Sequence, residues 1–200
     1  MANIYSWGKL GMSIRNEIHC TINSLSPFDE IEQEHISFTK NWIESGAEIF
    51  RTAKPATPDP HLVAYFLLID SSMHKVLLVD HKKAGLWLPA GGHVEPNEHP
   101  KETVRREILE ELGIEADFVM ADPLFLTVTR TVGQTAGHTD ISLWYILKGC
   151  SSISYAFDSE EFVQICWFSS DQIPYNQADP HMKRCIAKLS SLGVLEKARL

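Results

Sequence analysis

The chain has 200 residues, of which 44% are hydrophobic and 22% are charged, and its net charge at neutral pH is −8. This length supports one sizeable core, or a core with a short extension, and excludes several large domains. The acidic balance argues against a dedicated nucleic-acid-binding protein, which would present a basic patch, but metal ions can still provide positive charge for a small anionic substrate.

A first helix is predicted to begin at Ser26-Pro27, with acidic residues in its first turn, and to end at Ser45-Gly46. Its apolar stripe at helical spacing consists of Ile31, His35, Phe38 and Trp42. We expect this stripe to pack on the core, with a substrate lid or a homodimer contact as the alternatives. Because residues 1–25 are weakly patterned, residues 1–55 are interpreted as an N-terminal extension with one helix, and residues 56–200 as the main domain.

The main domain reads as strands interleaved with helices. A linker rich in proline covers 54–60, and it is followed by segments dense in β-forming residues, at 61–69, 76–79, 124–132, 141–147 and 163–168. One helix is predicted over 100–112, between Pro100 at its start and Gly113 just past its end, and a last helix from about 179 to 192. This mixed order predicts an α/β (α+β) sandwich.

The four cysteines, at positions 20, 150, 166 and 185, form no C-x-x-C pair, which favours reduced thiols over a disulfide framework or a structural zinc site. No apolar run approaches the ~20 residues needed to cross a bilayer, and the N-terminus lacks a secretory apolar segment. We therefore expect a cytoplasmic protein without membrane contact.

The helix over 100–112 carries an unusual concentration of glutamates beside its core-facing stripe. Its acidic positions at i, i+3 and i+4 are Glu107, Glu110 and Glu111. Such a cluster is most often a solvated face, but neighbouring carboxylates repel one another, and a divalent cation with a preference for oxygen ligands would relieve this repulsion. Gly91-Gly92 precede the helix and permit a tight turn that approaches a ligand closely. Arg106 offers a bidentate partner that can hold a carboxylate in place.

The stretch from Gly92 to Ile114 resembles the Nudix box, G-x5-E-x7-R-E-U-x-E-E-x-G-U with U an aliphatic residue. All nine specified positions match, at Gly92, Glu98, Arg106, Glu107, Ile108, Glu110, Glu111, Gly113 and Ile114. One departure lies between them, because Asn97 stands where many members have glycine. Asparagine tolerates left-handed backbone angles, so the turn is expected to survive.

The resemblance implies a Nudix fold, a mixed β-sheet between helices, and a hydrolase that cuts a phosphoanhydride bond in a nucleoside diphosphate derivative. It implies Mg²⁺ as the cofactor, with Mn²⁺ as a substitute. Carried over by position, the metal ligands would be Glu107, Glu110, Glu111 and the Gly91 carbonyl. Glu98 and Arg106 would support them, and Glu107 is the first choice for the general base.

Outside the box, four residues are weaker candidates for substrate contacts, namely Glu161, His138, Arg51 and Arg130. The partner would be a small nucleotide-like molecule. Two rival functions are a catalytically silent module that senses a nucleotide and an isomerase acting on an isoprenoid diphosphate. The silent module is disfavoured because every box glutamate is present. The isomerase would need a reactive cysteine and glutamate pair outside the box, and nothing in the sequence marks Cys150 or Cys166 as activated.

Overall fold

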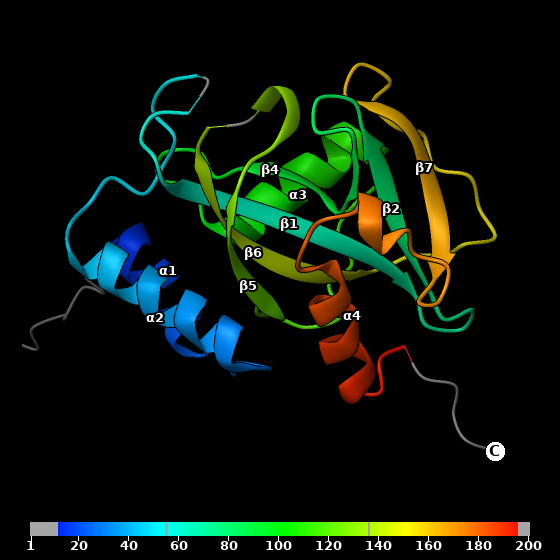
Figure 1. Cartoon of the computed structure of the whole chain (residues 1–200), viewed down its shortest axis with the longest axis horizontal. Coiled ribbons are helices and arrows are strands. Elements are labelled where there is room, and N and C mark those ends of the chain that lie inside the picture. The colour runs from blue at the N-terminus through cyan, green and yellow to red at the C-terminus, as the bar shows by residue number, and fades with distance from the viewer. Residues whose placement is uncertain (1–11, 55, 136, 196–200) are drawn as a thin grey trace, which may run out of the picture.

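Residues 12–54, 56–135 and 137–195 are described by the structure, a computed structural model (Figure 1). Seven strands form one mixed sheet, namely β1 (His61–Asp70), β2 (Lys75–His81), β3 (Leu86–Leu88), β4 (Ala90–His93), β5 (Phe125–Arg130), β6 (Thr139–Lys148) and β7 (Phe162–Ser169). The main path of the sheet runs β3-β2-β1-β6-β5, while β4 pairs with β1 and β7 pairs with β2. The sheet is mixed because β1 is parallel to β6 and antiparallel to β2 and β4.

Four α-helices accompany the sheet, namely α1 (Ile14–Asn23), α2 (Glu30–Glu44), α3 (Pro100–Leu112) and α4 (Met182–Ser191). The expected mixed sheet between helices is thus confirmed, and the helix predicted over 100–112 has the predicted bounds. The tight turn that was predicted at Gly91-Gly92 is not observed, because both glycines belong to strand β4. No helix in the described part of the chain combines the length and apolar character that a membrane span requires.

Successive residues of β1 alternate between two apolar layers, as the period of a strand requires. Leu62, Ala64 and Phe66 belong to a core cluster that also contains residues of α1, α2 and α3. Leu67 and Ile69 belong to a second cluster with residues of α4. The sheet therefore separates α3 from α4, and this alternation determines which side chains of β1 face each helix.

The N-terminal segment differs from the prediction in two respects. It contains two helices, where one was expected, because α1 begins at residue 14 with Ser13 as its N-cap. Helix α2 begins at Glu30 with Asp29 as its N-cap, three residues after the predicted start at Pro27.

The predicted apolar stripe of this helix is also wrong. Ile31 and Phe38 are 46% and 47% exposed. The buried face lies one residue further along the chain and consists of Glu32, Ile36, Thr39 and Ile43.

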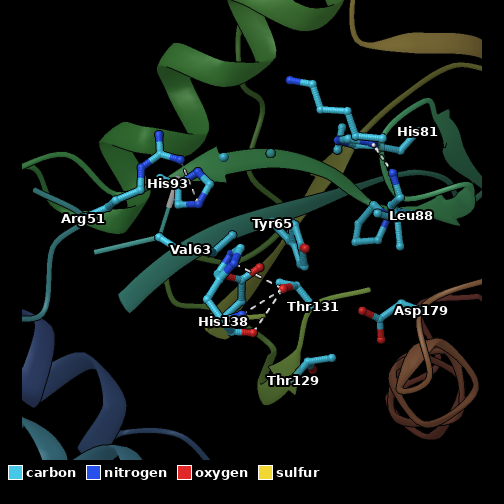
Figure 2. A pocket seen from close by; sticks show the side chains of 18 of the residues that line it. Arg51, Val63, Tyr65, His81, Leu88, His93, Thr129, Thr131, His138 and Asp179 are labelled. Atoms are coloured by element: carbon cyan, nitrogen blue, oxygen red, sulfur yellow. Dashed lines mark hydrogen bonds and ion pairs between the residues drawn. The ribbon is translucent and has the colours of Figure 1, made fainter. Parts of the chain in front are cut away.

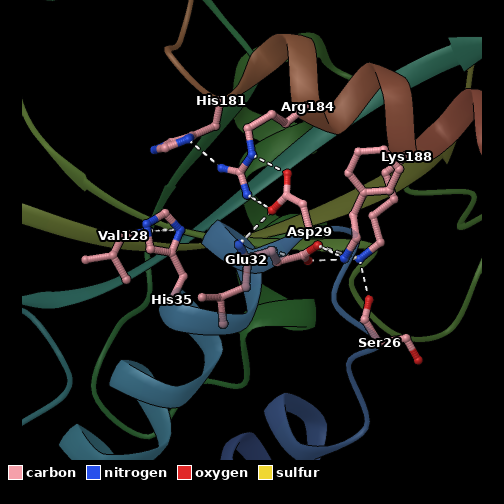
Figure 3. A network of polar contacts seen from close by, with 10 residues as sticks. Ser26, Asp29, Glu32, His35, Val128, His181, Arg184 and Lys188 are labelled. Atoms are coloured by element: carbon pink, nitrogen blue, oxygen red, sulfur yellow. Dashed lines mark hydrogen bonds and ion pairs between the residues drawn. The ribbon is translucent and has the colours of Figure 1, made fainter.

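A buried ion pair explains that rotation (Figure 3). The Lys188 ammonium on α4 donates to both carboxylate oxygens of Glu32 on α2, at 2.8 and 3.0 Å. The same carboxylate accepts from the backbone N–H groups of Phe28 and Leu126, so its lone pairs are largely satisfied although it is fully buried. A buried charge is tolerated only with such partners. The pair therefore joins the N-terminal helices to α4 and β5.

A second ion pair in this network provides a stability test. Arg184 donates its Nε to Asp29 at 2.7 Å, and this hydrogen bond lowers the pKa of the Asp29 carboxyl to about 2. Because the folded pKa lies below the unfolded one, the stabilisation is present above about pH 4 and is lost as the pH falls toward 2.

We predict that Asp29→Asn lowers the free energy of unfolding by about 1–2 kcal/mol at pH 7, since a shift of one pKa unit is worth about 1.4 kcal/mol and partial exposure reduces it. The asparagine retains the N-cap. In urea unfolding series at several pH values, the difference between wild type and variant should shrink below pH 4. A difference that stays constant down to pH 3 would contradict this assignment.

Candidate active site

Helix α3 presents its glutamates from a firmly fixed position. Its first turn has His99 as N-cap, and its C-cap Gly113 is left-handed with φ 67°. Three aliphatic side chains hold it on the sheet with at most 1% exposure, namely Val104, Ile108 and Leu112. The helix packs on β4, β1 and β6. Its acidic edge is therefore held beside the glycines of β4.

The two glycines of β4 permit close contacts that a side chain would block. Gly91 lies against the backbone of β1, and Gly92 lies against the carboxylate of Glu107. Gly91 pairs with Tyr65 of β1 and has φ 133°, and a Cβ there would lie 2.2 Å from the Ala64 carbonyl oxygen. A Cβ on Gly92 would lie 2.1 Å from Oε1 of Glu107. The carboxylate of Glu107 thus occupies the space that a side chain at position 92 would fill.

Arg106 connects the acidic residues. Its Nε and Nη2 each donate at 3.1 Å to one oxygen of Glu98, and its Nη1 donates at 2.6 Å to Oε1 of Glu107. Nη2 also donates to the His93 carbonyl at 3.3 Å. Bidentate pairing with a planar guanidinium fixes both position and orientation of a carboxylate.

The turn that carries Glu98 is built for this pairing. Thr103 and the backbone N–H of Glu95 donate to its Oε2 at 2.8 and 3.1 Å. Although burial raises its pKa, the hydrogen bonds from Arg106 and Thr103 outweigh this and lower it. The preceding Asn97 is left-handed with φ 66°, as its tolerance of such angles predicts. Glu98 is consequently a fixed anion that orients Arg106.

Glu107, which is half-buried, and Glu111, which is buried, form an acidic pair. Burial raises the pKa of Glu111 well above its ordinary value, and the negative charges of Glu107 and Glu161 raise it further. Burial likewise raises the pKa of Glu107 against the opposing effect of Arg106. Glu111 is 3% exposed, and its Oε2 is a buried acceptor that has no hydrogen-bond donor among the described residues. Two repelling carboxylates with a free buried oxygen fit a divalent cation, which prefers oxygen ligands.

The remaining box residues and Glu161 lie around this pair. Glu110 is largely exposed, and its carboxylate lies 3.5 Å from Nη1 of Arg106. The Gly91 backbone N–H donates to Glu111, which holds that segment of β4 against the helix. Glu161 was a weak sequence candidate, and the structure brings its charge close enough to Glu107 and Glu111 to raise the pKa of both. His81 lies 3.7 Å from it.

A cavity of about 1120 Å³ opens beside the acidic pair (Figure 2). This volume lies slightly above the usual range for small-molecule sites, roughly 300–1,000 Å³. Arg106, Glu107 and Glu161 line it on one side, and Arg51, Lys54 and Arg130 contribute positive charge. Arg130 is 68% exposed and lies 3.9 Å from Asp59, so it marks the rim.

Sequence reasoning singled out His138 but missed that it belongs to a group with His61 and His93, of which His93 and His138 line the same cavity. His138 is 6% exposed and lies beside His61 and His93, with the rings of His61 and His138 stacked at 5.0 Å. Arg51 donates to Nε2 of His93 at 3.2 Å, and burial together with this guanidinium lowers the pKa of His93 to about 3. The missing signal was the strand register, because it is the pairing of β1 with β4 and β6 that gathers these residues.

A family model described as the NUDIX domain matches residues 59–189 of the chain. Among curated proteins, the chain is 33% identical over 92 residues to a nucleoside triphosphatase NudI of Enterobacter sp. (strain 638), a match that covers 44% of this chain and 65% of the relative. It is 59% identical over 34 residues to a CTP pyrophosphohydrolase of Escherichia coli (strain K12), covering 17% of this chain and 25% of that protein. The chain thus spans less than two thirds of these relatives.

Solved structures support the same fold. A MutT NUDIX hydrolase from Burkholderia pseudomallei superposes with a TM-score of 0.53 at 21% identity, covering 64% of this chain and 96% of that one. At this level of identity the likeness concerns the fold.

We predict that Gly91→Ala destabilises the protein by more than about 3 kcal/mol, because the new Cβ would combine an unfavourable φ with a clash against the Ala64 carbonyl. Gly85→Ala is the matched control, since its φ is +66° and nothing lies within 4 Å of the added Cβ. That control should cost about 1–2 kcal/mol. Equal losses in thermal unfolding of the two variants would show that close approach to β1 is unimportant.

Proposed function

We propose, because this chain belongs to the Nudix family, that it hydrolyses a phosphoanhydride bond in a nucleoside triphosphate or a similar nucleoside diphosphate derivative, with Mg²⁺ as the cofactor. The observation that carries the proposal is the acidic pair of α3. Half-buried Glu107 lines a cavity large enough for a nucleotide, and buried Glu111 behind it has a carboxylate oxygen without a hydrogen-bond partner among the described residues. The names of the relatives, a nucleoside triphosphatase and a CTP pyrophosphohydrolase, favour nucleoside triphosphates as the first substrates to test.

The acidic residues divide into ligands and supports. Glu107 and Glu111 would hold the cation, Glu110 would contribute directly or through water, and the Gly91 carbonyl is the fourth candidate ligand. A bound divalent ion would neutralise phosphate charge and lower the pKa of water. Glu98 acts through Arg106, because its carboxylate fixes the guanidinium that in turn contacts Glu107.

Hydrolysis requires water to attack phosphorus while the bond to the bridging oxygen breaks. The proton of the attacking water needs an acceptor, and Glu107, a carboxylate that lines the cavity, is our first choice for this general base. Arg51 and Lys54 line the same cavity and provide positive charge for the phosphates. Arg106 keeps Glu107 oriented through the cycle.

The two rival functions find less support. The isoprenoid isomerase would need a reactive cysteine in the cavity, and neither Cys150 nor Cys166 is among the described residues that line it. The silent sensor would be expected to lack box glutamates, whereas here Arg106, Glu98 and Glu107 form a complete hydrogen-bonded set. Hydrolysis is therefore the function that we propose.

We expect Glu111→Gln to lower kcat for the preferred nucleotide at least ~100-fold without unfolding the protein, since it removes a charge that the cation requires. Glu102→Gln is the matched control on the same helix, because Glu102 is 61% exposed and pairs only with Arg105 at 3.4 Å among the described residues. Steady-state kinetics and circular dichroism on both variants provide the comparison. Full activity in the Glu111 variant would exclude the proposed role.

Removal of divalent ions provides a separate test. Treatment with EDTA should abolish release of phosphate or pyrophosphate from a panel of nucleoside triphosphates, nucleotide sugars, dinucleoside polyphosphates and ADP-ribose. Added Mg²⁺, or Mn²⁺ to a similar extent, should restore it. Activity that persists in EDTA on any of these compounds would rule out the metal-dependent reaction.

A further inference from the structure

Strand register gathers three histidines and an aspartate on one face of the sheet. His61 of β1 pairs with Asp140 of β6, and Val63 of β1 pairs with His93 of β4. Paired residues share a face, and so do residues two apart, so His138 joins Asp140 and His93 joins His61. One candidate ligand atom from each of the four lies within 4.8 Å of the others.

This face is not the one that carries the Nudix helix. Leu62 and Ala64, on the alternate positions of β1, pack in the cluster that contains α3. The odd-numbered positions continue into Leu67 and Ile69, which pack with α4. The histidine cluster and the glutamates of α3 therefore approach the cavity from opposite faces of β1, although His93, His138 and Asp140 all line it.

Two of the imidazoles are already oriented as metal ligands usually are. Nδ1 of His61 lies 2.7 Å from the Pro58 carbonyl, which can only accept, so this nitrogen carries the proton. Nδ1 of His138 lies 3.2 Å from Oγ1 of Thr131, and that hydroxyl donates its own proton to the His138 carbonyl. Figure 2 shows this contact. A histidine that binds a metal through one ring nitrogen usually donates a hydrogen bond from the other, and this bond fixes its tautomer.

With the proton on Nδ1, the Nε2 atom of each of these two rings carries a lone pair, and both lone pairs face the carboxylate of Asp140. His61 Nε2 lies 3.4 Å and His138 Nε2 lies 3.2 Å from Oδ1 of Asp140. His61 is fully buried, and within the part of the chain that the structure describes neither its Nε2 nor Oδ1 of Asp140 has a hydrogen bond. Three acceptors cannot satisfy one another, and a buried polar atom that is left unpaired destabilises the fold. A shared cation would resolve the conflict.

The spacing of these atoms agrees with a specific class of ion. A tetrahedral Zn²⁺ with bonds of about 2.0–2.1 Å holds its ligand atoms roughly 3.3–3.4 Å apart. The two distances to Asp140 match this value within 0.2 Å. Imidazole and carboxylate ligands suit zinc and related transition metals, whereas Mg²⁺ prefers an octahedron of oxygens. The ligand chemistry therefore differs from that of the acidic pair on α3.

The fourth member of the cluster has another role in this conformation. Arg51 donates to Nε2 of His93, and this bond leaves the proton of a neutral ring on Nδ1. His93 therefore has no free lone pair while the contact lasts. Figure 2 shows Arg51 alongside the His93 ring. Three protein ligands with one open position are typical of zinc sites that contact substrate.

We propose that His61, His138 and Asp140 bind a transition-metal ion of the zinc class, at a second site on the wall of the substrate cavity. The ion would place positive charge opposite the glutamates of α3. The site is independent of the proposed hydrolysis, because its ligands lie outside the Nudix box and can be tested by binding alone.

The test uses the full chain, stripped with a chelator, saturated with Mg²⁺ and then titrated with Co²⁺. Cobalt takes the place of zinc in such sites and absorbs visible light strongly when it is four- or five-coordinate. We expect one equivalent of Co²⁺ to give visible absorption bands that Zn²⁺ abolishes. Asp140→Asn and His138→Gln should each weaken binding at least ~100-fold, and Thr131→Val about 10–100-fold.

Two control variants should bind Co²⁺ as the wild type does. His19→Asn removes a histidine of α1 that is paired with Glu44, and Glu111→Gln alters the acidic pair of α3. Circular dichroism verifies that each variant is folded, and the wild-type titration remains decisive if a cluster variant is not. If the wild-type protein shows no visible absorption bands with Co²⁺, the proposal is overturned. Hydrogen bonding through an added proton, rather than a metal ion, would then join the histidines to Asp140. Binding unaffected by both cluster substitutions, or lost in Glu111→Gln, would overturn the proposal equally.

Discussion

The structure depends on the burial of two like-charged carboxylates, Glu107 and Glu111, between an amphipathic helix and a glycine strand. Both side chains are held at this position. The aliphatic face of α3 fixes the helix on the sheet, and the absence of a side chain at Gly92 leaves the space that the Glu107 carboxylate fills. Arg106 compensates one of the two charges, but an oxygen of Glu111 has no partner in residues 12–54, 56–135 and 137–195. In the function that we propose, a divalent cation would complete this arrangement, and a nucleotide phosphate would then meet positive charge at an acidic surface.

The same sheet explains why the cavity has two chemically different walls. Alternation along β1 sends its even-numbered residues toward α3 and its odd-numbered residues toward α4. The carboxylates of α3 gather on the first side, and the histidines gather with Asp140 on the second. Arg51 lies between the two groups, because it donates to His93 and its own pKa responds to the charges of both Asp140 and Glu107.

The sequence was sufficient for local features and insufficient for those created by pairing. Helix α3 was predicted correctly because Pro100 and Gly113 mark its ends and its aliphatic spacing marks its face. The stripe of α2 was assigned wrongly because the buried Glu32 is stabilised by Lys188, which lies 156 residues further along the chain. The histidine cluster was missed for a similar reason, since only the register of β1 with β4 and β6 brings His61, His93 and Asp140 together.

Anomalous diffraction from crystals grown with Mn²⁺ tests the central claim most directly, because it locates the ion without reference to any substrate. The account predicts a strong manganese peak within bonding distance of carboxylate oxygens of Glu107 and Glu111. Crystals of active protein with no such peak at this pair of residues would contradict it.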